Sequence, residues 1–368
     1  MEAAIIGCGV IARTHKGAID ADGRPNLRWT CDPDITAAKA VAPDARHAYD
    51  LAEVLLDDAV DVVHICTPHA VHKGQLLAAL AAGKHVICEK PLATTPADLR
   101  AMTAAAAAAQ SRGQVAACIF QHRHGGLVRR LKEMLDSGVF GQLTSAKLPF
   151  RCTRKQSYYD SGAWRGTWHT EGGGVCINQA IHSIDLLVWL CGNDPVSVQA
   201  SCSNKRLREV IEVEDEAFAT IGFNSGLSAE LDITNNQVDG WVTSCDIVGE
   251  RGSISVSQNG GGTIHAIQHD DQSVVDELRA IEAAIKAEDQ SALPGKACYG
   301  NLHNAQISDC YDAISEGRQP FVTIADGAVA AEVVLGIYHA TATGGRASLP
   351  LPDAYQVPNL LASSAASA

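Results

Sequence analysis

The sequence predicts an α/β protein of two domains: an N-terminal doubly wound parallel sheet and a C-terminal α+β domain with a large open, mainly antiparallel sheet. Three observations lead to this fold class. A glycine-rich turn follows the first apolar strand, strand and helix patterns then alternate, and beyond residue 137 turns rather than helices separate the strands. A length of 368 residues fits two domains, which we place at residues 1–120 and 121–368.

The composition indicates a soluble globular protein whose partners are small molecules. Hydrophobic residues make up 46% of the chain, the formal net charge is −13 and the pI is near 5.5. Nucleic acids and anionic membranes are bound by clustered Lys and Arg, and so neither partner is expected. The chain begins without a signal-like stretch and contains no apolar span of bilayer length, which favours a cytoplasmic location.

Cysteine usage also fits a reducing compartment. The twelve cysteines include no C-x-x-C pair, and most lie in apolar, strand-like stretches. We interpret them as reduced, buried, small apolar side chains, and we expect no metal site.

The first motif is a dinucleotide-binding turn. A short apolar strand leads into Gly7-Cys8-Gly9-Val10-Ile11-Ala12, where the glycines permit a tight turn and a close approach of backbone to a pyrophosphate. The next strand, 27–31, ends at Asp32, where an acidic residue accepts hydrogen bonds from the adenosine ribose and repels a 2′-phosphate. The pattern therefore predicts NAD, with NADP less favoured. The alternative for Asp32 is the N-cap of a helix at 35–41.

Alternating elements continue the parallel sheet to about six strands. The predicted elements are a strand at 61–66, the turn Thr67-Pro68-His69, a helix at 71–82, a strand at 85–88, a helix from Pro96 and a strand at 115–120. The strand at 85–88 ends in Glu89-Lys90-Pro91. Because ligands bind at the carboxyl ends of such strands and the proline keeps Lys90 extended, this is a candidate site; the alternative is a solvated pair.

In the second half, strands are predicted at 143–151, 197–203, 214–223, 227–234, 245–248 and 252–256, and helices at 127–137, 304–316 and 325–343. These strands form an antiparallel sheet with one face on helices and the other free for a second subunit.

A second candidate site follows Glu171-Gly172-Gly173-Gly174, which precedes a helix at 175–191. On this helix Asn178 and His182 share one face with Asp185, apart from an apolar stripe, and this polar trio is expected to face a cleft or solvent. The triple glycine would let a bulky substrate or cofactor approach; the alternative for His182 is a structural histidine. The residues Tyr158, Tyr159, Trp164, Arg165 and Trp168 before the glycines suit stacking on a sugar ring or, equally, packing of the loop on the sheet.

Taken together, these motifs resemble one family. The glycine turn, Cys66-Thr67-Pro68 with His72, Ala82-Gly83-Lys84-His85-Val86 with Glu89-Lys90-Pro91, the triple glycine through His182 to Asp185, and Asp326-Gly327 before Ile337-Tyr338 look like the Gfo/Idh/MocA oxidoreductases. The resemblance covers essentially the whole chain. It implies a Rossmann domain, a second domain with an open sheet, and hydride transfer at a sugar or cyclitol carbinol.

The resemblance also implies site residues. The catalytic lysine of the family falls on Lys90 and its catalytic histidine on His182, whereas Asn178 stands where many members, including inositol dehydrogenases, carry Asp. Expected cofactor contacts are Gly7, Gly9, Val10, Ile11, Asp32, Thr67, Pro68, His72, Glu89 and Lys90. Expected substrate contacts are Lys90, Arg123, Tyr158, Trp164, Arg165, Asn178 and His182.

We therefore expect an NAD-dependent sugar, glycoside or cyclitol dehydrogenase that forms a homodimer or homotetramer through the open sheet face. Two alternatives remain. One is a catalytically silent NAD- or sugar-sensing regulator of the same fold, against which Lys90 and His182 argue, and the other is an NAD-dependent glycoside-cleaving enzyme, for which a further acid or base is needed.

Overall fold

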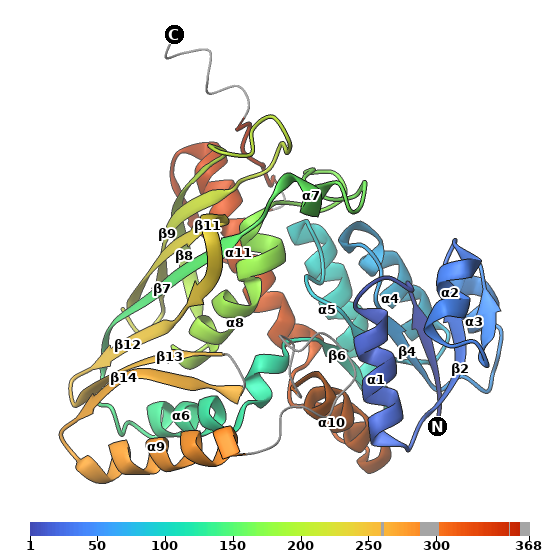
Figure 1. Cartoon of the computed structure of the whole chain (residues 1–368), viewed down its shortest axis with the longest axis horizontal. Helices are drawn as coiled ribbons and strands as arrows, with labels where there is room; N and C mark the ends of the chain where they lie inside the picture. Colours follow the sequence, from blue (N-terminus) through green and yellow to red (C-terminus); the bar gives the residue numbers. More distant parts are fainter. Residues whose placement is uncertain (259–260, 288–301, 353, 361–368) are drawn as a thin grey trace. The chain divides into compact units, whose positions relative to one another are not determined.

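The chain folds into two compact units, each with its own sheet (Figure 1). The structure is a computed structural model that describes residues 1–258, 261–287, 302–352 and 354–360. The first unit comprises Met1–Ala93, Ala97–His124 and Asp289–Ala328, and the second comprises Thr94–Pro96, Gly125–Glu288 and Val329–Ala368. Among the described residues, no helix has the length and apolar character needed to cross a membrane.

The first unit is built on a parallel six-stranded sheet in the order β3-β2-β1-β4-β5-β6. Its strands are β1 (Glu2–Ile6), β2 (Asn26–Cys31), β3 (Arg46–Ala48), β4 (Val62–Ile65), β5 (His85–Cys88) and β6 (Ala116–Cys118). The strand order reverses between β1 and β4, which is the switch point where doubly wound folds bind their ligands. The predicted fold class and strand number of this half are confirmed, although the short β3 was not predicted.

Helices of the first unit connect these parallel strands. They are α1 (Ala12–Asp22), α2 (Ile35–Val41), α3 (Leu51–Leu55), the 3₁₀ turn η1 (His69–Val71), α4 (His72–Ala81), α5 (Pro96–Gln110), the 3₁₀ turn η2 (Gln121–His124) and α10 (Leu302–Glu316). Helix α10 packs against α1 and η2. Its Ile307 and Tyr311 join Ile5, Ile19 and Ile87 in one buried cluster. This unit therefore also contains a helix from the second half of the chain.

The second unit is built on a nine-stranded mixed sheet in the order β14-β13-β12-β7-β10-β9-β8-β15, with β11 also paired to β7. Its strands are β7 (Leu143–Thr153), β8 (Pro195–Ser203), β9 (Glu216–Phe223), β10 (Ser228–Thr234), β11 (Asn236–Thr243), β12 (Cys245–Gly249), β13 (Gly252–Ser257), β14 (Thr263–His269) and β15 (Arg346–Ser348). Strands β7 and β10 run parallel, and the other pairs are antiparallel. The predicted mainly antiparallel sheet is confirmed.

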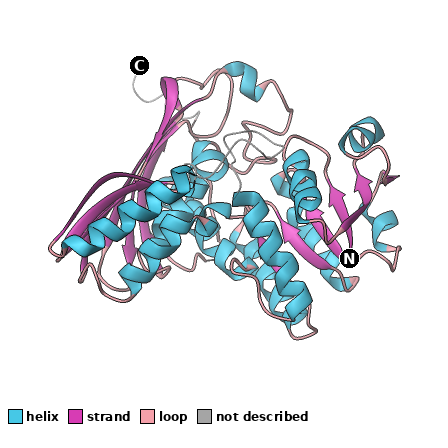
Figure 2. Cartoon of the chain, turned by 60° about the horizontal axis from the view of Figure 1, so that its bottom comes forward, coloured by secondary structure: helices cyan, strands magenta, loops and turns pink. Residues whose placement is uncertain are grey.

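Helices cover one face of this sheet (Figure 2). The helices that lie wholly or mostly in the second unit are α6 (Gly126–Asp136), α7 (Gln156–Tyr159), the π turn η3 (Cys176–Ala180), α8 (Ile181–Leu190), α9 (Gln272–Ala287) and α11 (Ile324–Thr343). Along β9, Ala217, Ala219, Ile221 and Phe223 are buried, whereas Phe218 is 48% exposed on the opposite face. The alternation of a half-buried strand is therefore present, with one aromatic side chain on the free face.

The cysteines of both units are buried. Eleven cysteines lie in the described residues, and all eleven are free thiols inside the fold. Burial raises the pKa of Cys66, Cys88, Cys176 and Cys245 well above the ordinary thiol value. The interpretation of these cysteines as reduced, small apolar side chains is confirmed, and Cys298 lies outside the described residues.

Candidate active site

The first group of candidate residues follows the carboxyl ends of four neighbouring strands. Ile6 of β1 is in register with Cys31 of β2 and Ile65 of β4, and Ile65 is in register with Cys88 of β5. Each strand ends at or just beyond this row. The glycine turn, Asp32, Thr67 and Lys90 therefore come to one edge of the parallel sheet, as the sequence predicts.

The glycine turn has the shape needed to hold a pyrophosphate. Gly7 has φ +85°, and a Cβ there would lie 2.8 Å from the carbonyl of Cys66, so that the turn can pass this closely over the end of β4 only as glycine. At Gly9 a Cβ would meet nothing within 4 Å, and the neighbouring Val10 is 59% exposed. This cradle precedes the N-terminus of α1, where backbone amides favour an anion, and it fits a dinucleotide.

Asp32 lies at the end of β2 beside this turn. Its Oδ2 accepts a hydrogen bond from the backbone amide of Cys8 at 2.8 Å, and its Oδ1 accepts one from Asp34 at 2.8 Å. The N-cap of α2 is Asp34, which accepts from Thr36. The alternative interpretation of Asp32 as this helix cap is therefore wrong, and its ribose contact stays a prediction.

Glu89 and His72 hold the backbone around Lys90. The Oε2 of Glu89 accepts a hydrogen bond from the backbone amide of Lys90 at 3.2 Å. His72 is fully buried, and its two ring nitrogens lie 2.8 Å from the carbonyl oxygens of Thr67 and Pro91. The side chain of His72 thus links the β4 turn to the segment after Lys90, and its expected contact with the cofactor stays a prediction.

Three other predicted residues, Thr67, Pro68 and Arg123, lie within the first unit. The hydroxyl of Thr67 donates to Gln75 Oε1 at 2.6 Å, and Pro68 caps η1. Arg123 in η2 is 2% exposed and forms an ion pair with Asp326, with 3.5 Å between Nη1 and Oδ1. This ion pair is made within the first unit, and the contact of Arg123 with a substrate stays a prediction.

The second group of candidate residues lies where a π turn leads into α8. The predicted helix at 175–191 begins with the π turn η3, which carries Asn178, and His182 follows in the first turn of α8. Both side chains are partly exposed, but Asp185 is 1% exposed, so its predicted position toward a cleft or solvent is wrong. Single π turns inside helices occur often at functional sites.

The triple glycine serves the protein's own packing. A Cβ at Gly172 would overlap the side chain of Thr94, one at Gly173 the hydroxyl of Tyr338, and one at Gly174 the carbonyl oxygen of Glu214. The prediction that these glycines leave room for a bulky ligand is therefore wrong. Their bare backbone instead lets neighbouring segments pack against the start of η3.

Tyr158 is the centre of a polar cluster around Asn178. Its hydroxyl oxygen accepts from Asn178 Nδ2 at 3.2 Å, from Gln179 Nε2 at 2.9 Å and from Arg165 Nη1. Asn178 Nδ2 also donates to Glu171 Oε1. The buried carboxylate of Glu171 therefore lies next to Asn178. Residue 178 is the position where many family members were expected to carry Asp.

The aromatic side chains before the glycines divide into two sets. The guanidinium of Arg165 lies 4.2 Å from the Tyr158 ring centroid and 4.4 Å from that of Trp164. Tyr159 is 8% exposed and packs, with Trp168 against it, in a cluster that includes Val213. Tyr158 packs against this cluster as Trp168 does, and so it contacts both sets. The contact of Tyr158, Trp164 and Arg165 with a sugar stays a prediction.

Glu214, which no sequence motif singled out, orders this region through its hydrogen bonds. Glu214 is 0% exposed and accepts hydrogen bonds from the amides of Gly174 at 2.8 Å and Cys176 at 2.9 Å, and from the Tyr338 hydroxyl at 2.8 Å. Burial raises its pKa to about 7. The signal available was the acidic run Glu212 to Glu216, which overlaps the start of the predicted strand at 214–223. A carboxylate that a strand buries requires hydrogen-bond donors of this kind.

No group of His, Cys, Asp and Glu that could hold a metal ion occurs within the described part of the chain. The glycine cradle at the switch point of the parallel sheet is the feature of a dinucleotide-binding domain. Two family models match the chain: "Oxidoreductase family, NAD-binding Rossmann fold" at residues 1–117 and "GFO/IDH/MocA C-terminal domain" at residues 128–255. The chain belongs to the Gfo/Idh/MocA family of NAD-binding oxidoreductases.

Individual relatives are similar over much of the chain. The 1,5-anhydro-D-fructose reductase of Ensifer adhaerens is 28% identical over 354 residues, which cover 94% of this chain and 97% of the reductase. The D-glucoside 3-dehydrogenase of Escherichia coli (strain K12) is 31% identical over 247 residues, 61% of this chain and 68% of that enzyme. The crystal structure of the WlbA dehydrogenase from Bordetella pertussis, in complex with NADH and UDP-GlcNAcA, is 27% identical with a TM-score of 0.84, and covers 96% of this chain and 98% of that one.

Proposed function

We propose that this protein transfers a hydride between a secondary hydroxyl of a sugar, glycoside or cyclitol and the nicotinamide of NAD. The observation that carries the proposal is a single one: in a family of NAD-binding oxidoreductases, Asn178 stands in the π turn η3 and His182 in the first turn of α8 that follows it. The printed names of the relatives support the substrate class, because anhydrofructose, glucoside and UDP-GlcNAcA are all sugars. In this proposal residues 1–120 bind the cofactor and residues 121–368 bind the substrate and a second subunit.

Oxidation of an alcohol needs a base for the hydroxyl proton and a positive charge for the developing alkoxide. His182 is proposed as the base, because an imidazole accepts a proton near neutral pH. Lys90 is proposed to orient the same oxygen and stabilise its negative charge. NAD⁺, when bound at the glycine turn and Asp32, accepts the hydride.

Asn178 narrows the substrate class. Its amide cannot exchange a proton as a carboxylate does, and it is already bonded to Glu171 and Tyr158. A proton relay through a carboxylate at residue 178, as expected for inositol dehydrogenases, is therefore not available in this chain. We favour a sugar carried on a glycoside or a nucleotide over free inositol, in keeping with the UDP-GlcNAcA bound by the Bordetella pertussis dehydrogenase.

A substrate panel followed at the NADH absorbance tests the proposal. The panel contains nucleotide sugars, alkyl glycosides, free aldoses and inositols, each with NAD⁺ and, for the keto forms, with NADH. Turnover of glycosides or nucleotide sugars supports the proposal, turnover of inositols alone contradicts the narrowed class, and no turnover by any member contradicts the dehydrogenase activity.

Asp32→Ser is expected to weaken the preference for NAD over NADP. One lost charge-assisted contact to the ribose corresponds to about 1.5–3 kcal/mol, or roughly a tenfold to hundredfold change in the ratio of dissociation constants. The ratio is measured by fluorescence titration with both cofactors. The matched control is Asp34→Ser, which removes a neighbouring charge and keeps a good cap on α2. Equal ratios in the two variants would mean that Asp32 does not contact the ribose.

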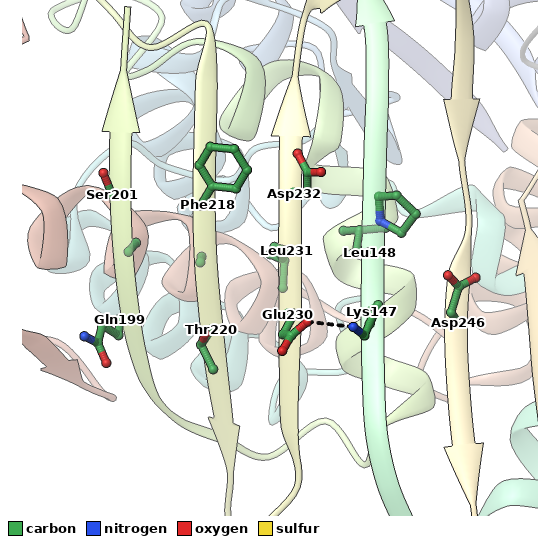
Figure 3. Close-up of a pocket in the computed structure, with 13 residues that line it drawn as sticks. Lys147, Leu148, Gln199, Ser201, Phe218, Thr220, Glu230, Leu231, Asp232 and Asp246 are labelled. Atoms are coloured by element: carbon green, nitrogen blue, oxygen red, sulfur yellow. Dashed lines mark ion pairs between the residues drawn. The ribbon is translucent and has the colours of Figure 1, made fainter.

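We also propose that the free face of the large sheet joins copies of this chain into a homodimer or homotetramer. Strands β7 to β10 and β12 present a shallow hollow there, in which Phe218 stands above Thr220 and the Lys147–Glu230 ion pair measures 2.9 Å (Figure 3). Arg151 and Asp232 form a second ion pair on the same strands. Alternating charges around an exposed aromatic ring suit a self-complementary contact, because each copy offers both signs.

Phe218→Asp is expected to shift the protein to smaller assemblies, since it places a charge in the apolar part of this contact. Light scattering after size exclusion measures the mass against 38.7 kDa for one chain. Leu56→Asp is the control, because Leu56 is 83% exposed on the other unit. A monomeric wild-type protein at micromolar concentration would contradict the proposal.

A further inference from the structure

A chain of hydrogen-bonded titratable side chains is buried in the first unit, next to the strand end that carries Lys90. The Tyr311 hydroxyl lies 2.7 Å from His64 Nε2, His64 Nδ1 lies 2.8 Å from His15 Nδ1, and His15 Nε2 lies 3.1 Å from Glu89 Oε1. These groups come from α10, β4, α1 and the end of β5. Glu89 is 5% exposed and the other three are 0% exposed. The sequence motifs did not single out Tyr311, His64 or His15.

With Glu89 ionised and both imidazoles neutral, the position of every proton in this chain is fixed. A carboxylate only accepts, so His15 must donate through Nε2–H, and its Nδ1 is then an acceptor in the neutral ring. His64 must therefore donate through Nδ1–H and accept at Nε2, which leaves the Tyr311 hydroxyl to donate. Each of the three contacts holds one proton, and the only formal charge is on Glu89.

The electrostatic environment favours this state. Burial alone would raise the pKa of Glu89, but hydrogen bonds from His15 and His303 hold it well below the usual value. Burial and the neighbouring His15 hold the pKa of His64 well below its usual value, and burial also lowers that of His303. These shifts favour an ionised Glu89 and neutral His64 and His303.

We propose that Tyr311, His64 and His15 form a tautomer-locked relay that keeps Glu89 ionised, and that Glu89 in turn positions Lys90. Glu89 Oε2 accepts the backbone amide of Lys90 at 3.2 Å, so the relay ends on the residue that stabilises the alkoxide. His15, His64 and Tyr311 are positioning residues in this proposal. The functional part of this proposal rests on the proposed role of Lys90. The predicted positions of the protons on His15, His64 and Tyr311 do not depend on that role.

Uptake of one proton would reverse the relay. Whether that proton resides on Glu89 or on His15, His15 Nδ1 becomes a donor, and both the His15–His64 and His64–Tyr311 hydrogen bonds change direction. The charged and titratable groups around the relay are His303, His72, Lys90, Cys66 and Cys88 near Glu89, and Asp22, Arg24 and Cys310 near Tyr311. Loss of the Glu89 charge removes the strong acceptor for the Lys90 amide.

The proton order is tested without any activity measurement. Nitrogen-15 NMR of the full chain labelled in histidine, with His15→Gln and His64→Gln for assignment, is expected to show two neutral rings at pH 7. His15 should carry its proton on Nε2 and His64 on Nδ1, which is the minor tautomer of free histidine. An imidazolium at either position, or Nε2–H on His64, would overturn the relay.

The positioning role is tested by two substitutions of similar size at His64. In His64→Gln the amide can still donate to His15 and accept from Tyr311, whereas His64→Leu can do neither. The acid-side limb of the kcat profile is expected to stay in place with Gln and to move to higher pH by about one unit with Leu, with the KM for NAD unchanged.

Equal profiles for the two variants would overturn the positioning role. If His64→Leu does not fold, the tautomers measured in the wild-type chain still decide the proton order. If Lys90→Ala retains full turnover while the tautomers are as expected, the role proposed for Lys90 fails and the relay remains.

Discussion

Lys90→Ala and His182→Ala are each expected to lower kcat by about 10² to 10⁴, the range typical of a lost general base or a lost preorganised charge. The measurement is initial-rate kinetics on the best substrate of the panel. Because both side chains are proposed to serve one oxygen, the double variant should be far less impaired than the product of the two single effects.

His265→Ala is the control for loss of a histidine, because His265 is exposed on β14 and has no proposed role. The dissociation constant for NAD should be unchanged in His182→Ala, which separates loss of chemistry from loss of cofactor. Near-normal turnover in His182→Ala would remove the proposed mechanism. Tyr158 or Tyr159 would then become the next candidate for the base, and Tyr158 is the more accessible of the two because it is partly exposed whereas Tyr159 is 8% exposed.

Gly174→Ala is expected to destabilise the protein by about 3–5 kcal/mol, in the exceptional range for one substitution. The new Cβ would overlap the carbonyl oxygen of Glu214, a backbone atom that cannot rotate away. Denaturant unfolding measures the loss. Turnover should also fall, because the displaced segment leads directly into η3 and Asn178.

Gly126→Ala is the matched control in the same unit. A Cβ there would lie 3.7 Å from Ile285 Cδ1, an ordinary contact, and Gly126 begins a helix. Its unfolding free energy should equal that of the wild type or slightly exceed it. Similar losses in both variants would mean that the close approach to Glu214 is not what requires glycine at residue 174.

The parallel sheet could be predicted nearly strand by strand because its central strands are short apolar runs bounded by glycine, proline or charged residues. Strand β5 was predicted with its observed bounds, His85–Cys88. Strand β3 was missed because Arg46–Ala48 is only three residues long, with one buried position. In the second unit β11 was missed for a related reason: most of Asn236–Thr243 is exposed, and it has no alternating apolar pattern.

The position of Lys90, Asp32 and the glycine turn at one sheet edge was predictable, because each follows a short apolar strand and the strand ends lie in register. Their contacts with ligands stay predictions. The candidate site was not predictable where tertiary packing decides. Asp185 was placed with Asn178 by helical spacing, but α8 is buried on nearly every side, so that spacing alone could not assign an exposed face. Glu171 and Glu214 act through hydrogen bonds to partners that only the fold brings together.

The eleven buried thiols can report the local opening of each sheet. A reagent such as an aromatic disulfide reaches a buried Sγ only when the surrounding structure opens, so the rate of labelling at each position measures a local opening free energy. Cys31 and Cys88 sample the parallel sheet, and Cys152 and Cys245 sample the mixed one. The opening free energies of the two sheets can therefore be compared in one labelling reaction, with no introduced probe.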